Sequence, residues 1–213
     1  MPIGADDTES VKRPIIALFG PTGIGKTAIA IALAERLRAA GQRPVAVSAD
    51  ALQLYAGLDL LTAAPTVAER AALEHELVAC FAVSERLSVA RYARLAHERI
   101  DALLADGSTA IVVGGTGLYL RAALCDLDLP PAVPPDVRER WLGELDAHGP
   151  EAMHARLAEL APANAATIAP SDRHRIVRAL ELHEIGALAP PRARSQLWSG
   201  EMRHPTRLVG LVM

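Results

Sequence analysis

The segment from Gly20 to Thr27 contains the residues whose types and spacing point most directly to chemistry. It follows the pattern G-x-x-x-x-G-K-T and runs Gly20, Pro21, Thr22, Gly23, Ile24, Gly25, Lys26, Thr27. Glycines allow consecutive backbone N–H groups to converge on an anion, and the lysine brings an ammonium group to the terminal phosphates. The Thr27 hydroxyl can bind Mg²⁺. The segment therefore predicts a site for a diphosphate or triphosphate, with a glycine-rich turn and an incidental lysine as the alternative.

Asp50 is the acid that we expect beside this loop. Proteins that hydrolyse nucleoside triphosphates usually carry an aspartate at the end of an apolar strand, where it helps to hold Mg²⁺. Here the apolar run 110–113 ends in Gly114-Gly115-Thr116-Gly117 and has no acid. Asp50 follows another apolar run, so it could act as a general base or bind Mg²⁺. The alternative is that Asp50 caps the next segment.

The elements around these residues predict an α/β fold. Residues 15–19 are typical of a buried strand, and a helical pattern with Ile29, Leu33 and Leu37 on one face follows and ends at Gly41. Residues 45–48 complete a strand–helix–strand unit, which favours a parallel sheet. Together with the phosphate loop, this unit predicts a P-loop NTPase-like parallel sheet with flanking helices and an inserted helical lobe.

Further along the chain, strand and helix patterns separate into two regions. We expect one short helix near residues 67–76, a helix from Ser88 to Gly107 with Tyr92 on its apolar face, and a strand at 109–113. A proline cluster after Leu129 introduces helices without strands at 136–147, 150–160 and 171–185, and residues 207–213 again look like a strand. The predicted organisation is a flexible tail (1–13), an α/β core (14–123 and 206–213), a helical insertion (124–195) and a connecting loop (196–205).

Composition excludes several classes of protein. A hydrophobic fraction of 51% excludes a disordered chain, and the apolar runs are too short to cross a membrane. Two cysteines without metal-type spacing favour a reducing, cytoplasmic environment. The net charge is −3, but residues 173–213 hold seven arginines and three glutamates, a balance of +4. This basic C-terminal segment could meet a polyanion, or it could be an ordinary solvated surface.

Several segments, in the same order, resemble the tRNA dimethylallyltransferases, also called tRNA isopentenyltransferases. That family typically shows G-P-T-x-x-G-K-T, S-A-D-S-x-Q-V-Y, T-A-K-P-T, H-H-L, Y-S-V-A-x-F, G-G-T-G-L-Y and N-D-x-x-R-I-x-R-A-L-E. The corresponding segments here are 20–27, 48–55 (SADALQLY), 62–66 (TAAPT), 75–77 (HEL), 87–92 (LSVARY), 114–119 (GGTGLY) and 171–181 (SDRHRIVRALE). The resemblance runs from about residue 14 to residue 213.

The resemblance implies transfer of a dimethylallyl group from dimethylallyl diphosphate to N6 of an adenosine next to the anticodon of tRNA. Asp50 would accept the N6 proton, and the diphosphate would leave from the phosphate loop. Lys26, Thr22, the loop amides and Mg²⁺ on Thr27 would stabilise the charge on the leaving diphosphate. The donor would thus bind along residues 20–27, and the protein would be a cytoplasmic monomer.

The same resemblance implies that the helical insertion, 124–195, binds the tRNA anticodon stem-loop, and it places tRNA contacts along the chain. Those expected at the target adenosine are Asp50, Ala51, Leu52 and Gln53, and those expected elsewhere on the anticodon stem-loop are Thr116, Arg138, Asp172, Arg175 and Arg178. Each arginine could instead form a surface ion pair, for instance with Glu181 or Asp172, and Thr116 could be a turn hydroxyl. Trp141 and Met153 are expected in the core.

Three departures from the family pattern leave alternatives open. Ala51 stands where the family has serine, and His75-Glu76-Leu77 replaces H-H-L. The family also continues well beyond the position that matches Met213, so the chain is expected to be truncated relative to it. The alternatives are a small-molecule kinase that uses the phosphate loop, and a fragment that binds diphosphate or tRNA without catalysing transfer.

Overall fold

The computed structural model describes residues 14–191 and 201–212, which form two compact units. The first unit comprises 14–127 and 201–212, and the second comprises 128–191. The expected tail (1–13), the last residues of the expected insertion (192–195) and the first half of the expected connecting loop (196–200) lie outside the described residues. Residues 124–127, which we expected in the insertion, belong to the first unit. Leu124 is buried there and its carbonyl accepts a hydrogen bond from the Arg203 N–H at 2.9 Å.

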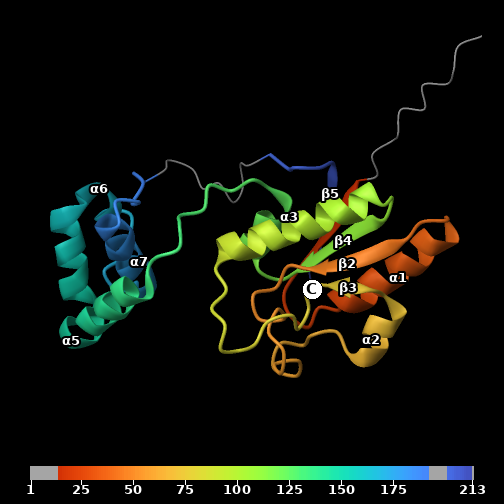
Figure 1. Ribbon diagram of the computed structural model, residues 1–213, viewed down its shortest axis with the longest axis horizontal. Coiled ribbons are helices and arrows are strands. Elements are labelled where there is room, and N and C mark those ends of the chain that lie inside the picture. The colour runs from red at the N-terminus through yellow and green to blue at the C-terminus, as the bar shows by residue number, and fades with distance from the viewer. Residues whose placement is uncertain (1–13, 192–200, 213) are drawn as a thin grey trace, which may run out of the picture. The chain divides into compact units, whose positions relative to one another are not determined.

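The first unit is built on a five-stranded parallel sheet with the order β3-β2-β4-β1-β5. The strands are β1 (Ile15–Phe19), β2 (Pro44–Ser48), β3 (His75–Glu76), β4 (Thr109–Gly114) and β5 (Thr206–Gly210). Helices α1 (Lys26–Ala39) and α3 (Val89–Ala105) lie on opposite faces of this sheet (Figure 1). The predicted fold class, a parallel sheet with flanking helices, is confirmed.

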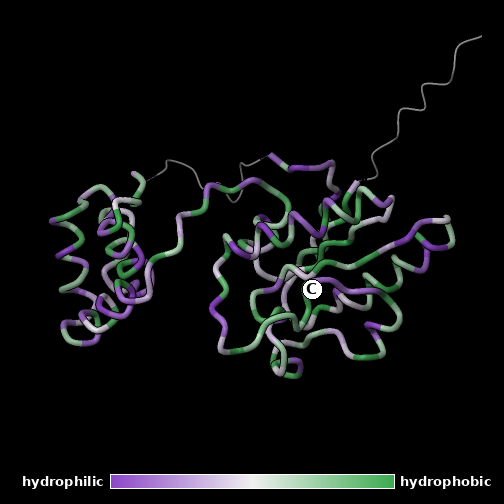
Figure 2. Tube along the Cα trace, in the orientation of Figure 1, coloured by the Kyte–Doolittle hydropathy of each residue, from purple (hydrophilic) through white to green (hydrophobic). Residues whose placement is uncertain are grey.

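The central strands are apolar because helices cover both of their faces. Every residue of β2 is buried, and the strands of the first unit are mostly hydrophobic in Figure 2. On one face, Leu18, Ala46 and Ile111 pack against α1 (Lys26–Ala39). Strand β5 pairs only with β1 among the described strands, and the side chains of Leu208 and Val209 are 49% and 42% exposed.

Helix α1 buries a different face from the one that we predicted. Ala30 and Ala34 are fully buried against the sheet, whereas Ile29 is exposed and Leu33 and Leu37 are partly buried. The helix is apolar almost all round at its start, so periodicity could not select one face. Small alanines allow the helix to approach the strands closely.

The short helix α2 (Val67–Ala72) ends earlier than we predicted. Thr66 and Glu69 form a capping box at its start, with the Glu69 N–H donating to Thr66 Oγ1 at 3.2 Å and the Thr66 N–H donating to the Glu69 carboxylate at 2.8 Å. Leu73 is extended and fully buried, and residues 75–76 form β3 instead of a helical turn. Burial against β2 therefore outweighs the helical pattern at 73–76.

Two helices cover the second face of the sheet. Helix α3 (Val89–Ala105) begins where Ser88 Oγ accepts a hydrogen bond from the Arg91 N–H at 3.1 Å, as its sequence predicted. Helix α4 (Gly117–Leu124) was not predicted; it packs against α3 and follows β4 directly. Its start lies at the carboxyl end of β4, where ligands of such sheets bind.

Helices are the only regular elements in the described residues of the second unit, 128–191. They are α5 (Pro135–Leu160), α6 (Pro162–Ala165) and α7 (Arg173–Glu184). Helix α5 kinks at Gly149, whose φ is +79°, and Pro150 then starts its second half. Trp141 and Met153 are buried between α5 and α7, so both belong to the core as predicted.

Candidate functional site

The phosphate loop has the backbone geometry that its sequence predicts. Gly23 and Gly25 adopt φ values of +84° and +89°, which glycine alone adopts at little cost, and α1 starts at Lys26. The Lys26 ammonium donates hydrogen bonds to the carbonyls of Gly20 and Pro21 at 2.9 and 2.8 Å. The lysine therefore lies across the loop, and the N-terminus of a long helix faces the same space.

The glycine pair at the end of β4, Gly114 and Gly115, allows the residue after β2 and the phosphate loop to approach β4 closely. A Cβ at Gly114 would lie 2.4 Å from the Ala49 carbonyl oxygen, which no side chain tolerates. A Cβ at Gly115 would lie 3.1 Å from the Gly20 carbonyl oxygen and 3.4 Å from Lys26 Nζ. These two glycines thus take the place of a strand-end acid and bring Ala49, which precedes Asp50, against β4.

Asp50 and the phosphate loop share one cleft at the carboxyl end of the sheet. The cleft opens to solvent, and the space in it together with the adjoining solvent is about 380 Å³. Its lining comprises Lys26, Thr27, Ala30, Ala46, Ser48, Asp50, Gln53, Pro65, His75, Val113 and Gly114. Polar groups lie beside an apolar wall, so the cleft can accommodate an anion next to a hydrocarbon group.

Asp50 caps the turn that follows it and still faces the cleft. Its Oδ1 accepts hydrogen bonds from the N–H groups of Leu52 and Gln53 at 3.0 and 3.4 Å. Both bonds use the same oxygen, so Oδ2 can take a proton or an ion. Burial lowers the pKa of Lys26, and the negative charge of Asp50 opposes that shift. Asp50 thus both orders its own turn and stabilises the charged form of Lys26.

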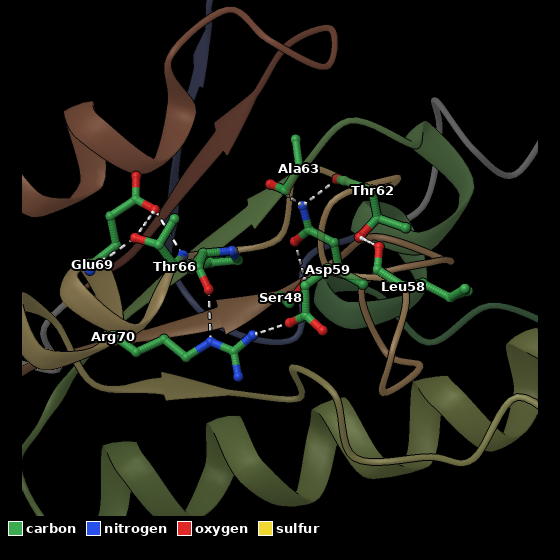
Figure 3. A network of polar contacts seen from close by, with 10 residues as sticks. Ser48, Leu58, Asp59, Thr62, Ala63, Thr66, Glu69 and Arg70 are labelled. Atoms are coloured by element: carbon green, nitrogen blue, oxygen red, sulfur yellow. Dashed lines mark hydrogen bonds and ion pairs between the residues drawn. The ribbon is translucent and has the colours of Figure 1, made fainter.

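The side-chain amide of Gln53 connects this turn to the loop opposite. Ser48 Oγ donates to Gln53 Oε1 at 3.2 Å, and Gln53 Nε2 donates to the carbonyls of Thr62 and Ala63, both at 3.2 Å (Figure 3). The predicted role of Gln53 was contact with the target adenosine. In this structure its amide is engaged within the chain, where it fixes one wall of the cleft.

A second set of contacts in Figure 3 holds the outer part of the same loop. Arg70 donates to the carbonyl of Pro65 at 2.7 Å and to the Asp59 carboxylate at 2.6 Å. Thr62 Oγ1 donates to the Leu58 carbonyl at 2.9 Å. The segment 58–66 is therefore fixed by side-chain hydrogen bonds at both of its ends.

Two features of the site were not predicted. All three tyrosines of the chain gather near Asp50: the Tyr92 hydroxyl donates to the Ser48 carbonyl at 2.9 Å, and its ring lies 4.7 Å from that of Tyr119. Burial, and then the nearby Tyr55 and Asp50, raise the pKa of Tyr119. His75 lines the cleft as well; its Nδ1 lies 2.6 Å from the Leu73 carbonyl, and burial lowers its pKa. The sequence feature that could have drawn attention to the tyrosines is the scarcity of aromatic residues, which make up 3% of the chain.

The other predicted RNA contacts of the first unit lie on loops at the same end of the sheet. Thr116 precedes α4 and makes no side-chain capping bond, so a turn role for its hydroxyl has no support here. Leu52 is exposed and Ala51 is partly exposed, beside Asp50. Thr22, which is expected to contact the diphosphate and not RNA, is exposed in the phosphate loop.

The remaining predicted RNA contacts all lie in the second unit, on α5 and α7. Asp172 caps α7 through the Arg175 N–H at 3.0 Å and forms an ion pair with Arg175 Nε at 3.4 Å. Arg138 and Arg178 each form an ion pair with Glu181. The ion pairs of the alternative interpretation therefore exist, and contact with RNA remains a prediction.

The donor set of the cleft fits a Mg²⁺ ion held largely by its substrate. Thr27 and Asp50 offer a hydroxyl and a carboxylate, which are hard oxygen ligands. Among the described residues, no group of three or more His, Cys, Asp or Glu side chains could hold a metal ion. Mg²⁺ commonly keeps several waters and binds through one or two protein oxygens plus phosphate.

One further structural finding concerns membranes. Within residues 14–191 and 201–212, no helix combines the length and the hydrophobicity that crossing a bilayer requires.

Comparison with known proteins gives a consistent result. The model of the IPP transferase family matches residues 53–211. A tRNA dimethylallyltransferase of Kineococcus radiotolerans is 46% identical over 173 residues, which is 81% of this chain and 54% of that protein. One of Streptomyces coelicolor is 48% identical over 171 residues, 80% of this chain and 53% of that protein. The chain thus spans about half the length of these curated relatives.

A solved structure agrees with the sequence matches. The tRNA isopentenylpyrophosphate transferase of Bacillus halodurans superposes with a TM-score of 0.52 at 33% identity, over 84% of this chain and 57% of that one.

Proposed function

The chain belongs to the IPP transferase family, and we propose that its cleft binds dimethylallyl diphosphate and transfers the dimethylallyl group to N6 of an adenosine next to the anticodon of tRNA. The observation that carries this proposal is the shared cleft, in which Lys26 and Thr27 lie with Asp50. A phosphate site supplies a place for a leaving group, and an aspartate supplies a place for a proton.

The reaction balances as a displacement at the first carbon of the donor. The bond between that carbon and the diphosphate oxygen breaks, and a bond from adenosine N6 to the same carbon forms. The N6 proton passes to Asp50, whose Oδ1 is already fixed by two backbone N–H groups. Lys26 turns from the carbonyls of Gly20 and Pro21 to the diphosphate as negative charge builds there.

Bound Mg²⁺ would neutralise part of the charge on the leaving diphosphate. Thr27 would hold the ion, and the loop amides and Thr22 would orient the phosphates around it. Val113, the partly exposed apolar residue of the lining, would contact the hydrocarbon group and help to exclude water from it. Exclusion of water protects the donor from hydrolysis before the adenosine arrives.

The remaining parts of the proposal concern partners and location. The names of the relatives indicate tRNA as acceptor, and the basic residues of α7 are expected to meet its anticodon stem-loop. We expect a cytoplasmic protein that acts as a monomer.

A transfer assay tests this function directly. The purified 213-residue chain is incubated with labelled dimethylallyl diphosphate, Mg²⁺ and unmodified tRNA, and the tRNA is digested to nucleosides. The proposal expects label on N6 of adenosine, and none with a tRNA that carries guanosine at the target position. Phosphate transfer from ATP to a small acceptor would favour the kinase alternative. Absence of transfer by a folded chain that binds the diphosphate would leave a binding role only.

A further inference from the structure

Glu181 is a charged residue in the interior of the second unit. Its side chain is fully buried on α7, and its neighbours Ile176, Val177 and Leu180 belong to the hydrophobic cluster of that unit. An unpaired carboxylate in such a place would cost several kcal/mol or would become protonated. Whether the Glu181 carboxylate is stable as a buried charge therefore depends on the groups that contact it.

Both carboxylate oxygens of Glu181 are occupied by arginines. Oε1 accepts from Nη1 of Arg138 on α5 at 3.3 Å, and Oε2 accepts from Nη1 of Arg178, one turn earlier on α7, at 3.2 Å. Arg178 also donates through Nη2 to the Pro131 carbonyl at 2.9 Å. One buried group thus brings two guanidinium groups from different helices to the same point.

The two arginine side chains of this cluster are partly exposed to solvent, whereas the glutamate side chain is not. Arg138 and Arg178 are 45% and 34% exposed, whereas Glu181 is 0% exposed. Solvent therefore meets two cations and no carboxylate, with a local charge of about +1. A guanidinium has five N–H donors in a planar fork, so donors remain on both arginines beyond those used inside.

Other ion pairs of the second unit lack this property. In the pairs Arg173–Asp146, Arg156–Glu144 and Arg140–Glu184 the carboxylates are 76%, 38% and 32% exposed. An approaching anion would meet those carboxylates as well as the arginines. Among the ion pairs in the described part of this unit, only those of Glu181 have a carboxylate that is completely buried, so that solvent contacts their arginines alone.

We propose that Glu181 is a positioning residue, which holds Arg138 and Arg178 as a paired site for backbone phosphate of the RNA substrate. This inference rests on the proposed function, because that function supplies the RNA. The site recognises phosphate geometry and charge without reading bases. Orientation by a buried carboxylate reduces the side-chain freedom that each arginine loses when RNA binds.

The test is binding of a labelled anticodon stem-loop RNA by the full chain, without donor, across a range of salt concentrations. Glu181→Gln keeps the size of the side chain, but its amide can accept from one arginine only. We expect about tenfold weaker binding and a salt dependence shallower by about 0.7–0.9 in the log–log slope, the loss of one phosphate contact. Arg138→Ala should do the same, and adding Glu181→Gln to it should cost little more.

The matched control is Asp146→Asn, which removes an exposed carboxylate from the same unit. It should leave RNA binding equal or slightly tighter. If Glu181 were merely one more negative charge, Glu181→Gln would also bind RNA equally well or more tightly, and that result would overturn the proposal.

A second pair of variants guards against misfolding of Glu181→Gln. Arg138→Lys keeps the charge on an exposed side chain but removes the planar fork, and should weaken RNA binding about threefold; Arg140→Lys should not. Unchanged binding by Arg138→Lys overturns the inference while the proposed function stands. A wild-type chain that does not bind the stem-loop at all overturns both, whereas binding without transfer counts against the function alone.

Discussion

Replacement of Gly114 by alanine tests the close approach of β4 to the turn that carries Asp50. The added Cβ would lie 2.4 Å from the Ala49 carbonyl oxygen, and an ordinary contact begins at 3.4 Å, so the two must separate by about 1 Å. The same place holds a hydrogen bond from the Ala49 N–H to the Val113 carbonyl at 2.7 Å. The methyl group therefore cannot be accommodated without moving the strand end.

Two magnitudes follow from this displacement. Overpacking of a tight core costs about 1–3 kcal/mol, and for a chain of this size each kcal/mol lowers Tm by about 2–4 °C. We therefore expect a fall in Tm of about 2–12 °C by circular dichroism. A shift of about 1 Å at Asp50 should also lower the rate of dimethylallyl transfer about 10²-fold.

Gly117 provides the matched control in the same unit. A Cβ there meets nothing within 4 Å, and its backbone does not require glycine. Gly117→Ala should change Tm by less than about 1 °C. If Gly114→Ala also left Tm and the transfer rate unchanged, the close packing of β4 against Ala49 would be refuted.

Three further predictions concern the loop, the cleft wall and pH. Lys26→Ala should weaken binding of inorganic diphosphate about 10- to 150-fold by calorimetry, because it removes a charge-assisted hydrogen bond; unchanged affinity would exclude a phosphate role. Gln53→Leu should speed hydrogen exchange of the Thr62 and Ala64 amides about tenfold, and equal rates would show that the loop does not depend on it. Burial, and then Arg203, lower the pKa of His97 below its ordinary 6.5, although Asp126 and Asp101 oppose the shift. The unfolded chain thus binds a proton more readily, and urea unfolding should show stability decreasing as pH falls below about 6.5. His97→Gln should flatten that slope; an unchanged slope would contradict the assignment.

The parts of the fold that could be predicted are those with a strong local signal. The phosphate loop fixes where β1 ends and α1 starts, and Ser88 fixes the start of α3. Proline and glycine residues predicted both halves of α5 with the break at Gly149, and α7, whereas the short helix α6 was not predicted. Each of these signals depends on backbone chemistry within a few residues.

The parts that could not be predicted depend on contacts between distant segments. His75 and Glu76 form a strand because they pair with β2, which is distant in the sequence. The local sequence by itself favours a helix there, so the strand could not be predicted from it. The gathering of Tyr92 and Tyr119 near Asp50 requires α3 and α4 to meet on one face of the sheet. The internal role of Gln53 likewise depends on a loop that follows it by about ten residues.

The central claim is that Asp50 accepts a proton in a cleft whose phosphate loop holds the leaving diphosphate. The most direct measurement compares Asp50→Asn with the wild-type chain in two assays, transfer of labelled dimethylallyl to tRNA and binding of inorganic diphosphate. We expect transfer to fall about 10²- to 10⁴-fold while diphosphate affinity stays within about threefold. Transfer at the wild-type rate, or an equal loss in both assays, would contradict the role of Asp50.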